Sequence, residues 1–207
     1  MARPPTTTPD GLDETMQTNY LGPFFLTSLL MPNMRESWNR TGLLSRVVCV
    51  ASGMHRYGKC LYSRIGTPSS YRRFRAYADS KLCLTMFVAE LDRRFGASGL
   101  AAVSVRPGTV STGITRNSAV LKAMFFFLRP FLTSVEEAAT AVVGSVDDPD
   151  LRSGGYYDRE RPRNPSPESR DPYGQRTLWE ATRSVIQDKT GMRVFSPDLS
   201  RAQPVIS

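Results

Sequence analysis

Tyr77 and Lys81 stand out in the sequence because their types and their spacing suggest acid–base chemistry. On a helix, residues four apart lie on one face, so the phenol and the ammonium would be neighbours. A nearby positive charge favours the phenolate and lowers the pKa of a tyrosine from its reference value of about 10. A tyrosine tuned in this way can give a proton to a carbonyl or take one from an alcohol. A half-buried tyrosine beside a surface lysine is the alternative interpretation, because this spacing alone also arises by chance.

Ser52 is a further candidate because it closes an apolar run at 46–52. The run is unbroken rather than alternating, as expected of a strand buried on both faces of a parallel sheet. In such sheets ligands bind at the edge formed by the carboxyl ends of the strands. Tyr77 begins the helix between this run and the next, 101–106, so three separate segments should meet at that edge. The candidates that follow the second run are Pro107, Gly108, Thr109 and Thr112.

Asn19 is the last candidate, because Pro23 lies four residues after it. Proline has no N–H, so the regular helical hydrogen bond to the Asn19 carbonyl cannot form. A carbonyl freed in this way needs another partner, and a water molecule is the simplest. Such a water could extend a proton path from the Lys81 ammonium to solvent. An ordinary polar helix residue is the alternative interpretation of Asn19.

The elements that must position these residues alternate between helices and short strands. Apolar periodicity and capping signals predict helices at 10–36, 75–95, 134–146 and 175–188. A third short strand is predicted at 154–158, after an apolar helix or helical loop at 119–128. The charged, proline-rich stretch 159–173 is interpreted as a loop or a disordered segment. This order predicts right-handed crossovers and a parallel sheet with helices on both faces.

The composition indicates a globular domain and narrows its partners. A chain of 207 residues with 40% hydrophobic and 22% charged residues can build one soluble domain with a core. No apolar run is long enough to cross a bilayer, and the N-terminus lacks the apolar core of a signal peptide. The three cysteines lack metal-type spacing, so free thiols in a reducing compartment and no metal site are expected. A net charge of +8 favours a solvated basic surface over a nucleic-acid partner, because no aromatic-interleaved stripe accompanies the basic residues.

Four motifs in order resemble those of the short-chain dehydrogenase/reductase superfamily. They are Thr-Asn-Tyr-Leu-Gly-Pro-Phe-Phe-Leu-Thr at 18–27, Arg-Val-Val-Cys-Val-Ala-Ser at 46–52, Tyr-Ala-Asp-Ser-Lys at 77–81 and Val-Arg-Pro-Gly-Thr-Val-Ser-Thr at 105–112. The resemblance is nearest to the retinol-dehydrogenase-like branch, through Thr-Pro-Asp-Gly at 8–11, Gly-Gly-Tyr-Tyr at 154–157 and Leu-Trp-Glu at 178–180. It implies a partial catalytic domain at 8–190 and a disordered tail at 191–207.

The resemblance implies a role for each candidate residue. Tyr77 resembles the general acid/base, and Lys81 resembles the residue that lowers its pKa and binds the nicotinamide ribose. Ser52 resembles the hydroxyl that orients the substrate carbonyl, and Asn19 resembles the residue whose main chain holds a relay water. The phenylalanines at 125–127 resemble a lid over an apolar substrate, with a core helix as the alternative. The segment resembling the one that lies against the nicotinamide amide contains Pro107, Gly108, Thr109 and Thr112.

The resemblance also implies segments that this sequence does not contain. Members of the superfamily begin with a strand and a glycine-rich turn that binds the pyrophosphate of the dinucleotide, and later carry an Asn-Asn-Ala-Gly segment. The 15 glycines here never fall in the Gly-x-x-x-Gly-x-Gly pattern. We therefore expect the C-terminal half of a Rossmann-type doubly wound parallel sheet, about three strands with flanking helices, without its nucleotide-binding half. The run 46–52 should then be an unpaired edge, and cofactor affinity should be very low.

Two functions are consistent with this sequence. The resemblance implies an oxidoreductase that transfers hydride between NADP or NAD and an apolar alcohol or carbonyl, such as a retinoid or a steroid. The alternative is an inactive fragment or partner protein that modulates a full-length homologue by forming a heterodimer; a homodimer is a further expectation. An intracellular location is expected, cytoplasmic or associated with the endoplasmic reticulum, and membrane association is left open.

Overall fold

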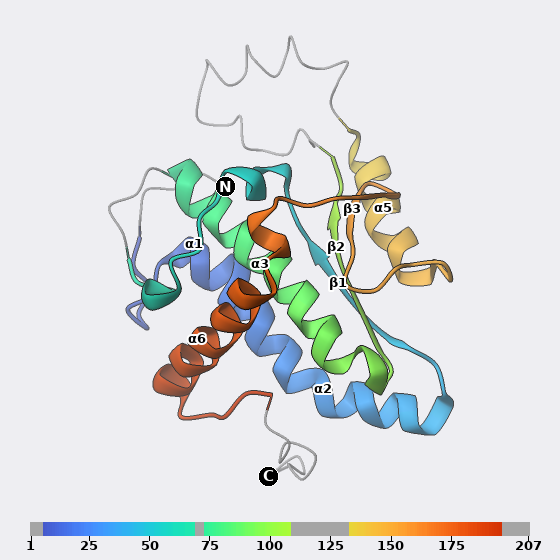
Figure 1. The fold of residues 1–207 in the computed structure, drawn as a ribbon, viewed down its shortest axis with the longest axis horizontal. Helices are drawn as coiled ribbons and strands as arrows, with labels where there is room; N and C mark the ends of the chain where they lie inside the picture. The colour runs from blue at the N-terminus through green and yellow to red at the C-terminus, as the bar shows by residue number, and fades with distance from the viewer. Residues whose placement is uncertain (1–5, 69–72, 109–132, 196–207) are drawn as a thin grey trace.

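The structure, a computed structural model, describes residues 6–68, 73–108 and 133–195 of the chain. In these ranges a four-stranded sheet lies between helices, with α2 (Gly22–Thr41) and α3 (Arg73–Phe95) on one face (Figure 1). The other face is covered by α5 (Val135–Asp147), and α6 (Pro172–Thr190) packs against α3. The prediction of an α/β fold with helices on both faces of a sheet is therefore confirmed.

The strands follow one another across the sheet in the order β1-β2-β3-β4. β1 (Ser45–Val50) pairs in parallel with β2 (Leu100–Arg106), and β3 (Tyr156–Asp158) pairs in parallel with the other side of β2. The three predicted strands are thus present, and their parallel pairing brings their carboxyl ends to one edge. Among the described residues β1 pairs only with β2, so β1 is an edge strand, as the sequence also predicted.

The stretch 159–173 corrects an expectation from the sequence, because it forms defined elements rather than a disordered segment. β4 (Arg161–Arg163) turns back and pairs antiparallel with β3. The turn is made by Arg159, which adopts a positive φ of 58° and donates its N–H to the Arg106 carbonyl at 2.7 Å. Pro162 does not prevent the pairing, because an edge strand tolerates a missing N–H on its open side.

The first helix begins later and ends later than the predicted range 10–36. It starts as α1 (Glu14–Met16), where the Asp13 side chain accepts a hydrogen bond from the Met16 N–H at 2.8 Å and acts as the N-cap. It continues through the π-helical turn Gln17–Leu21 into α2. Gly42 ends it with a left-handed φ of 69°, a conformation that glycine adopts without strain. These bounds are set by the cap at Asp13 and by the glycine that follows Thr41, rather than by apolar periodicity.

The three remaining helices, α3, α5 and α6, lie within three residues of their predicted bounds. The capping box predicted at Ser134 and Glu137 is formed at the start of α5, with both of its hydrogen bonds at 3.0 Å. α6 begins three residues earlier than predicted because Asp171 caps it, accepting hydrogen bonds from the N–H groups of Tyr173 and Gly174. Both boundaries therefore follow from a local side-chain cap.

The main hydrophobic core lies between α2, α3 and α6. Its centre is a group of buried aromatic rings, in which Phe24 contacts both Phe87 and Trp179 with ring centroids 5.0 Å apart. Val194 is buried, and the Phe195 ring lies 4.5 Å from that of Trp179. Residues 194 and 195, which belong to the predicted tail 191–207, therefore bury apolar surface in the core. Residues 196–207 lie outside the described ranges.

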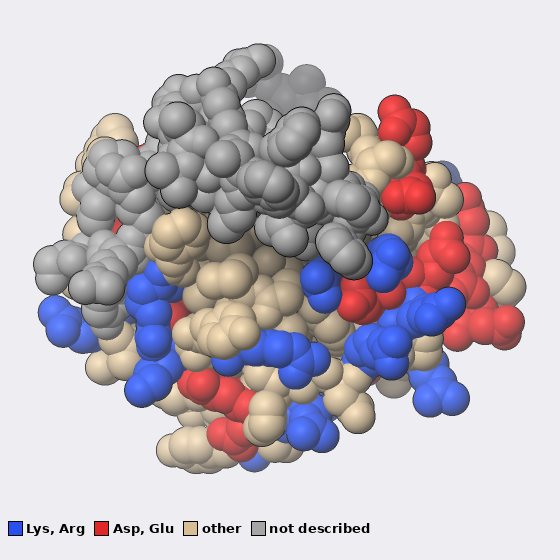
Figure 2. All heavy atoms as spheres, turned by 90° about the horizontal axis from the view of Figure 1, so that it is seen from above, with Lys and Arg blue, Asp and Glu red and all other residues tan. Residues whose placement is uncertain are grey.

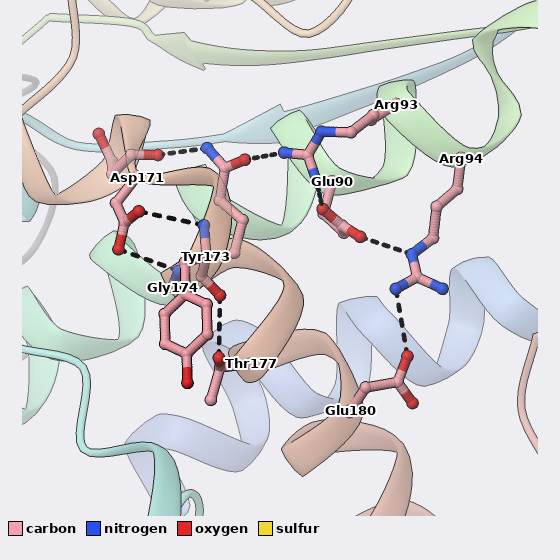
Figure 3. Close-up of polar contacts among 10 residues, drawn as sticks. Glu90, Arg93, Arg94, Asp171, Tyr173, Gly174, Thr177 and Glu180 are labelled. Atoms are coloured by element: carbon pink, nitrogen blue, oxygen red, sulfur yellow. Dashed lines mark hydrogen bonds and ion pairs between the residues drawn. The ribbon is translucent and has the colours of Figure 1, made fainter.

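A polar network joins α3 to α6 at the side of this core. Glu90 is 2% exposed, and its carboxylate accepts hydrogen bonds from Arg93 and Arg94 (Figure 3). Arg94 also donates to Glu180 at 3.1 Å, and Arg93 donates to the side chain of Gln175. The network satisfies a buried carboxylate and fixes how the two helices pack.

The surface charge is mixed rather than gathered in one stripe. On the face shown in Figure 2, lysine and arginine side chains alternate with carboxylates. Several of the arginines form ion pairs, such as Arg75 with Asp79 at 2.9 Å and Arg106 with Asp158 at 3.0 Å. None of the helices in the described ranges is long and apolar enough to span a lipid bilayer.

Candidate active site

Lys81 connects α3 to the carboxyl end of β1. Its Nζ donates a hydrogen bond to the Val50 carbonyl at 2.8 Å and lies 5.8 Å from the centroid of the Tyr77 ring. The sequence predicted that this lysine and this tyrosine share a helix face, and both lie in α3 at that spacing. Because Val50 is two residues before Ser52, the hydrogen bond places the Lys81 ammonium close to the segment that carries Ser52.

Lys81 is half-buried and lies near Cys49. Burial lowers the pKa of Lys81, and the nearby Cys49 opposes that change. Burial also raises the pKa of Cys49 to about 12, so this residue is a neutral thiol at physiological pH. The ammonium thus faces a carbonyl and a neutral thiol, and it keeps donors and charge for a hydroxyl or a phenolate nearby.

Asn19 reaches α3 through its side chain. Its Nδ2 donates to Ser80 Oγ at 3.1 Å, and Ser80 Oγ donates to the Tyr77 carbonyl at 2.8 Å. Asn19 lies in the π-helical turn, where the Gly22 N–H bonds to the Gln17 carbonyl. In such a turn carbonyls pair with N–H groups five residues on, so the regular helical pattern is already interrupted just before Pro23, which has no N–H. A water held by the Asn19 main chain stays a prediction.

Ser52 caps the short 3-10 turn Gly53–Tyr57 that follows β1. Its Oγ accepts a hydrogen bond from the Met54 N–H at 3.3 Å, and the residue is half-buried. A hydroxyl that accepts one hydrogen bond still has its proton to donate. Ser52 therefore keeps the donor that a substrate carbonyl would need. The turn packs against α3, the helix that carries Tyr77 and Lys81.

His55 is a residue that the sequence reasoning missed. Its Nδ1 lies 2.7 Å from the Ser52 carbonyl, and its Nε2 lies 3.0 Å from the Ser166 N–H. A carbonyl can only accept and an N–H can only donate, so Nδ1 carries the proton and Nε2 is bare. Burial lowers the pKa of His55, which agrees with this neutral form. The signal in the sequence was a lone histidine three residues after Ser52.

The turn after β2 requires glycine. Gly108 has a φ of 97°, and a Cβ at this position would lie 2.0 Å from Thr133 Oγ1. A side chain here would therefore strain the backbone and clash with Thr133. Pro107 precedes it at the same edge of the sheet as Val50 and is half-buried. Thr109, Thr112 and the phenylalanines at 125–127 lie outside the described residues.

The residues present fit the nicotinamide ribose of a dinucleotide better than its pyrophosphate. A phenol, an ammonium and a hydroxyl, the groups of Tyr77, Lys81 and Ser52, are donors of the kind that the hydroxyls of a ribose and a reacting oxygen accept. The pyrophosphate needs a glycine-rich turn that leads into a helix N-terminus, and the glycines of this sequence do not form that pattern. Among the described residues no group of acidic, histidine or cysteine side chains could hold a metal ion.

A pocket beside α3 is not lined by the predicted site residues. It lies on the side of α3 that carries Ala76 and Asp79, and Lys59, Leu61 and Gly66 line it from the preceding loop. The described contacts of Lys81 and Ser52 lie instead at the carboxyl end of β1. Geometry at the strand ends, rather than this pocket, supports the candidate site.

Comparison with known proteins gives the family. The model of the short chain dehydrogenase family matches residues 4–120, more than half of the chain. The human WW domain-containing oxidoreductase is 35% identical over 201 residues, which cover 92% of this chain and 47% of that protein. Human retinol dehydrogenase 11 is 29% identical over 188 residues, which cover 90% of this chain and 58% of that protein. The chain thus spans about half the length of these relatives.

A solved structure supports the same conclusion. The crystal structure of an uncharacterized protein from Mycobacterium paratuberculosis matches with a TM-score of 0.67 and 25% identity, over 90% of this chain and 63% of that chain. The family match contains all of the predicted site residues, from Asn19 to Thr112. The sequence motifs, the parallel sheet and these relatives agree: the chain belongs to the short-chain dehydrogenase/reductase superfamily, in its retinol-dehydrogenase-like branch.

Proposed function

We propose that this protein acts in the interconversion of an apolar alcohol and its carbonyl with NADP or NAD, and that Tyr77 is the general acid/base. The observation that carries the proposal is the Lys81 contact: the ammonium sits at the carboxyl end of β1, on the helix face that it shares with Tyr77. These two contacts support a site in which a proton donor, a positive charge and the segment of Ser52 act together, as carbonyl chemistry requires.

In this proposal each residue acts on the reacting oxygen or on its neighbour. The Ser52 hydroxyl donates a hydrogen bond to the substrate carbonyl and orients it. Tyr77 Oη gives its proton to that oxygen as the carbonyl becomes an alcohol, and the Lys81 charge stabilises the phenolate that remains. A bound nicotinamide supplies the hydride. In the opposite direction the Tyr77 phenolate takes the proton from the alcohol.

Cofactor binding is proposed to rest on the nicotinamide end. Tyr77 and Lys81 would hold the ribose, and Pro107, Gly108, Thr109 and Thr112 would lie against the nicotinamide amide. Because the sequence has no glycine-rich cradle, the isolated chain should bind a complete dinucleotide weakly. The apolar substrate class is supported by the similarity to retinol dehydrogenase 11 and by the phenylalanines proposed as a lid at 125–127.

The test uses half of the cofactor, so that the missing cradle does not matter. The full chain is mixed with reduced nicotinamide mononucleotide at high concentration and an apolar aldehyde, and the loss of nicotinamide absorbance is followed. The native protein should accelerate the reaction, and Tyr77→Phe should lose about 10²- to 10⁴-fold of that rate because only the hydroxyl is removed. Tyr57→Phe, an exposed tyrosine, is the matched control and should react as the native chain does. Equal rates for the native chain and Tyr77→Phe would refute the proposed acid/base.

A second candidate function is favoured by the open edge of β1. Among the described residues this strand has a partner on one side only, and an unpaired edge is a surface that can accept another chain. We therefore also propose a partner protein that modulates a full-length homologue by heterodimerisation. It should co-purify with such a homologue and show no effect of nucleotides. Tight binding of NADPH to the isolated chain, measured by calorimetry, would contradict it.

A further inference from the structure

Cys60 and Cys83 form a close pair of buried thiols away from the proposed active site. Their Sγ atoms lie 3.7 Å apart, although the residues are 23 positions apart in the sequence. Cys83 belongs to α3 and is fully buried, whereas Cys60 is 8% exposed and lies in a segment without regular secondary structure. A disulfide needs its sulfurs about 2 Å apart, so a side-chain rotation and a small movement of the segment around Cys60 suffice.

The contacts around Cys60 hold its segment along α3. Gly58 lies so close to the helix that an added Cβ would come within 2.5 Å of the Ala78 carbonyl oxygen. The Lys59 N–H donates to Asp79 Oδ1 at 2.7 Å, and the Cys60 N–H donates to Glu168 Oε1 at 3.2 Å. Three successive residues are thus fixed, and the two sulfurs are kept together by the packing of the segment rather than by chance.

The two thiols differ in exposure. The pKa of Cys83 is raised well above its usual value, first by its hydrogen bond to Cys60 and then by burial, so this thiol keeps its proton. Cys60 is 8% exposed, and its neighbours Lys59 and Leu61 both line the pocket beside α3. Cys60 is therefore the more accessible of the two residues.

We propose that Cys60 and Cys83 are a reversible oxidation site that forms an intramolecular disulfide on reaction with a hydroperoxide. The Cys60 thiolate attacks one peroxide oxygen, the O–O bond breaks, and the sulfur becomes a sulfenic acid. The Cys83 sulfur then attacks Cys60 and expels hydroxide, which leaves as water with the Cys83 proton. Two thiols lose two electrons and two protons, and the peroxide is reduced to water and an alcohol, or to two waters.

The full native chain is the sample for the test. It is treated with hydrogen peroxide in the folded state, unfolded in N-ethylmaleimide, and analysed by mass spectrometry. The three free cysteines of the untreated protein should all be alkylated, and only Cys49 should be alkylated after treatment. Without the alkylating agent, the treated protein should be lighter by about 2 Da, the mass of two hydrogen atoms. Digestion should give one cross-linked species that joins the peptides of Cys60 and Cys83, and dithiothreitol should reverse it.

Matched variants separate this pair from the third cysteine. Cys49→Ser should keep the loss of about 2 Da, whereas Cys60→Ser and Cys83→Ala should abolish it. The cross-linked peptide is looked for in the digest of the native chain, without any variant. The proposal can therefore be tested even if one of the variants fails to fold. A cross-link that contains Cys49, or oxygen added to Cys60 without a cross-link, would overturn the proposal. So would a native protein that keeps three reactive thiols after treatment.

Discussion

At the scale of single residues, two side chains fix the end of β1. Lys81 bonds to the Val50 carbonyl from α3, and His55 bonds to the Ser52 carbonyl from the turn that follows. The Ser52 segment is therefore held from two directions before any ligand binds. Such preorganisation matters because a displacement of about 1 Å at a reacting group can cost about 10²-fold in rate.

His55 should make the stability of the protein depend on pH. Because burial lowers its pKa below the ordinary value of 6.5, the unfolded chain binds a proton more readily than the folded protein. The stabilisation is complete above the unfolded pKa and is lost as the pH falls from there towards the folded pKa. Protonation of Nε2 would also remove the acceptor for the Ser166 N–H.

Urea unfolding of the native chain and of His55→Gln at pH 8 and pH 5 measures this effect. The native protein should lose more free energy of unfolding than the variant between the two pH values, because the variant has no proton to bind at this position. The variant also controls for the carboxyl groups, which are the same in both proteins. An equal loss in both would show that His55 does not titrate in this way.

At the scale of elements, the packing of α6 on α3 depends on a buried carboxylate. Glu90 is almost fully buried and bonds to two arginines, whereas Glu180 is 54% exposed and bonds to one of the same arginines. The contacts of Glu90 are stronger because they are buried, whereas water and salt screen the contact of Glu180. The two glutamates therefore provide a matched comparison within one network.

Glu90→Ala should lower the free energy of unfolding by about 2–3 kcal/mol, because it removes charged hydrogen bonds and leaves a cavity. Glu180→Ala should lower it by about 0–1 kcal/mol, as expected of an exposed ion pair. Chemical denaturation monitored by circular dichroism gives both values. A larger loss for Glu180→Ala would mean that the exposed pair, rather than the buried carboxylate, holds α6 on α3.

At the scale of the whole molecule, β1 has an edge that no other strand of the described ranges pairs with. The N–H groups of Ser45 and Ala51 donate to Gly99 and Val105 of the β2 side. Because the direction alternates along a strand, the N–H of Val47 also faces β2, whereas the N–H of Val50 faces the open edge. Val50 is 44% exposed, so an apolar side chain accompanies this outward N–H group. Such an edge invites pairing with another chain.

Proline substitutions test this edge. Val50→Pro removes an outward N–H but keeps the carbonyl that binds Lys81, so it should reduce self-association with little loss of stability. Val47→Pro removes an inward N–H and should destabilise the sheet by about 3 kcal/mol or more. Sedimentation velocity measures the association, and thermal unfolding measures the stability. If the native chain and Val50→Pro associate equally, the edge of β1 is not the contact surface.

The sequence by itself determined the family and the order of the elements, and the site residues that it predicts stay a prediction. Unbroken apolar runs predicted the parallel strands, a capping box predicted α5, and the Tyr77–Lys81 spacing predicted one helix face. These features are local, because each depends on residues a few positions apart. Periodicity did not give the bounds of the helices, because the Asp13 and Asp171 caps set where the helices begin.

Only the tertiary structure decided what depends on residues distant in sequence. Three contacts of this kind join separate elements. They are the hydrogen bond from Lys81 to Val50, the hydrogen bonds of His55 with Ser52 and Ser166, and the close approach of Cys60 to Cys83. β4 and the burial of residues 194 and 195 were missed for the same reason, because short segments gain their stability from the surface they meet. Local pattern cannot report that surface, since it exists only after the chain has packed.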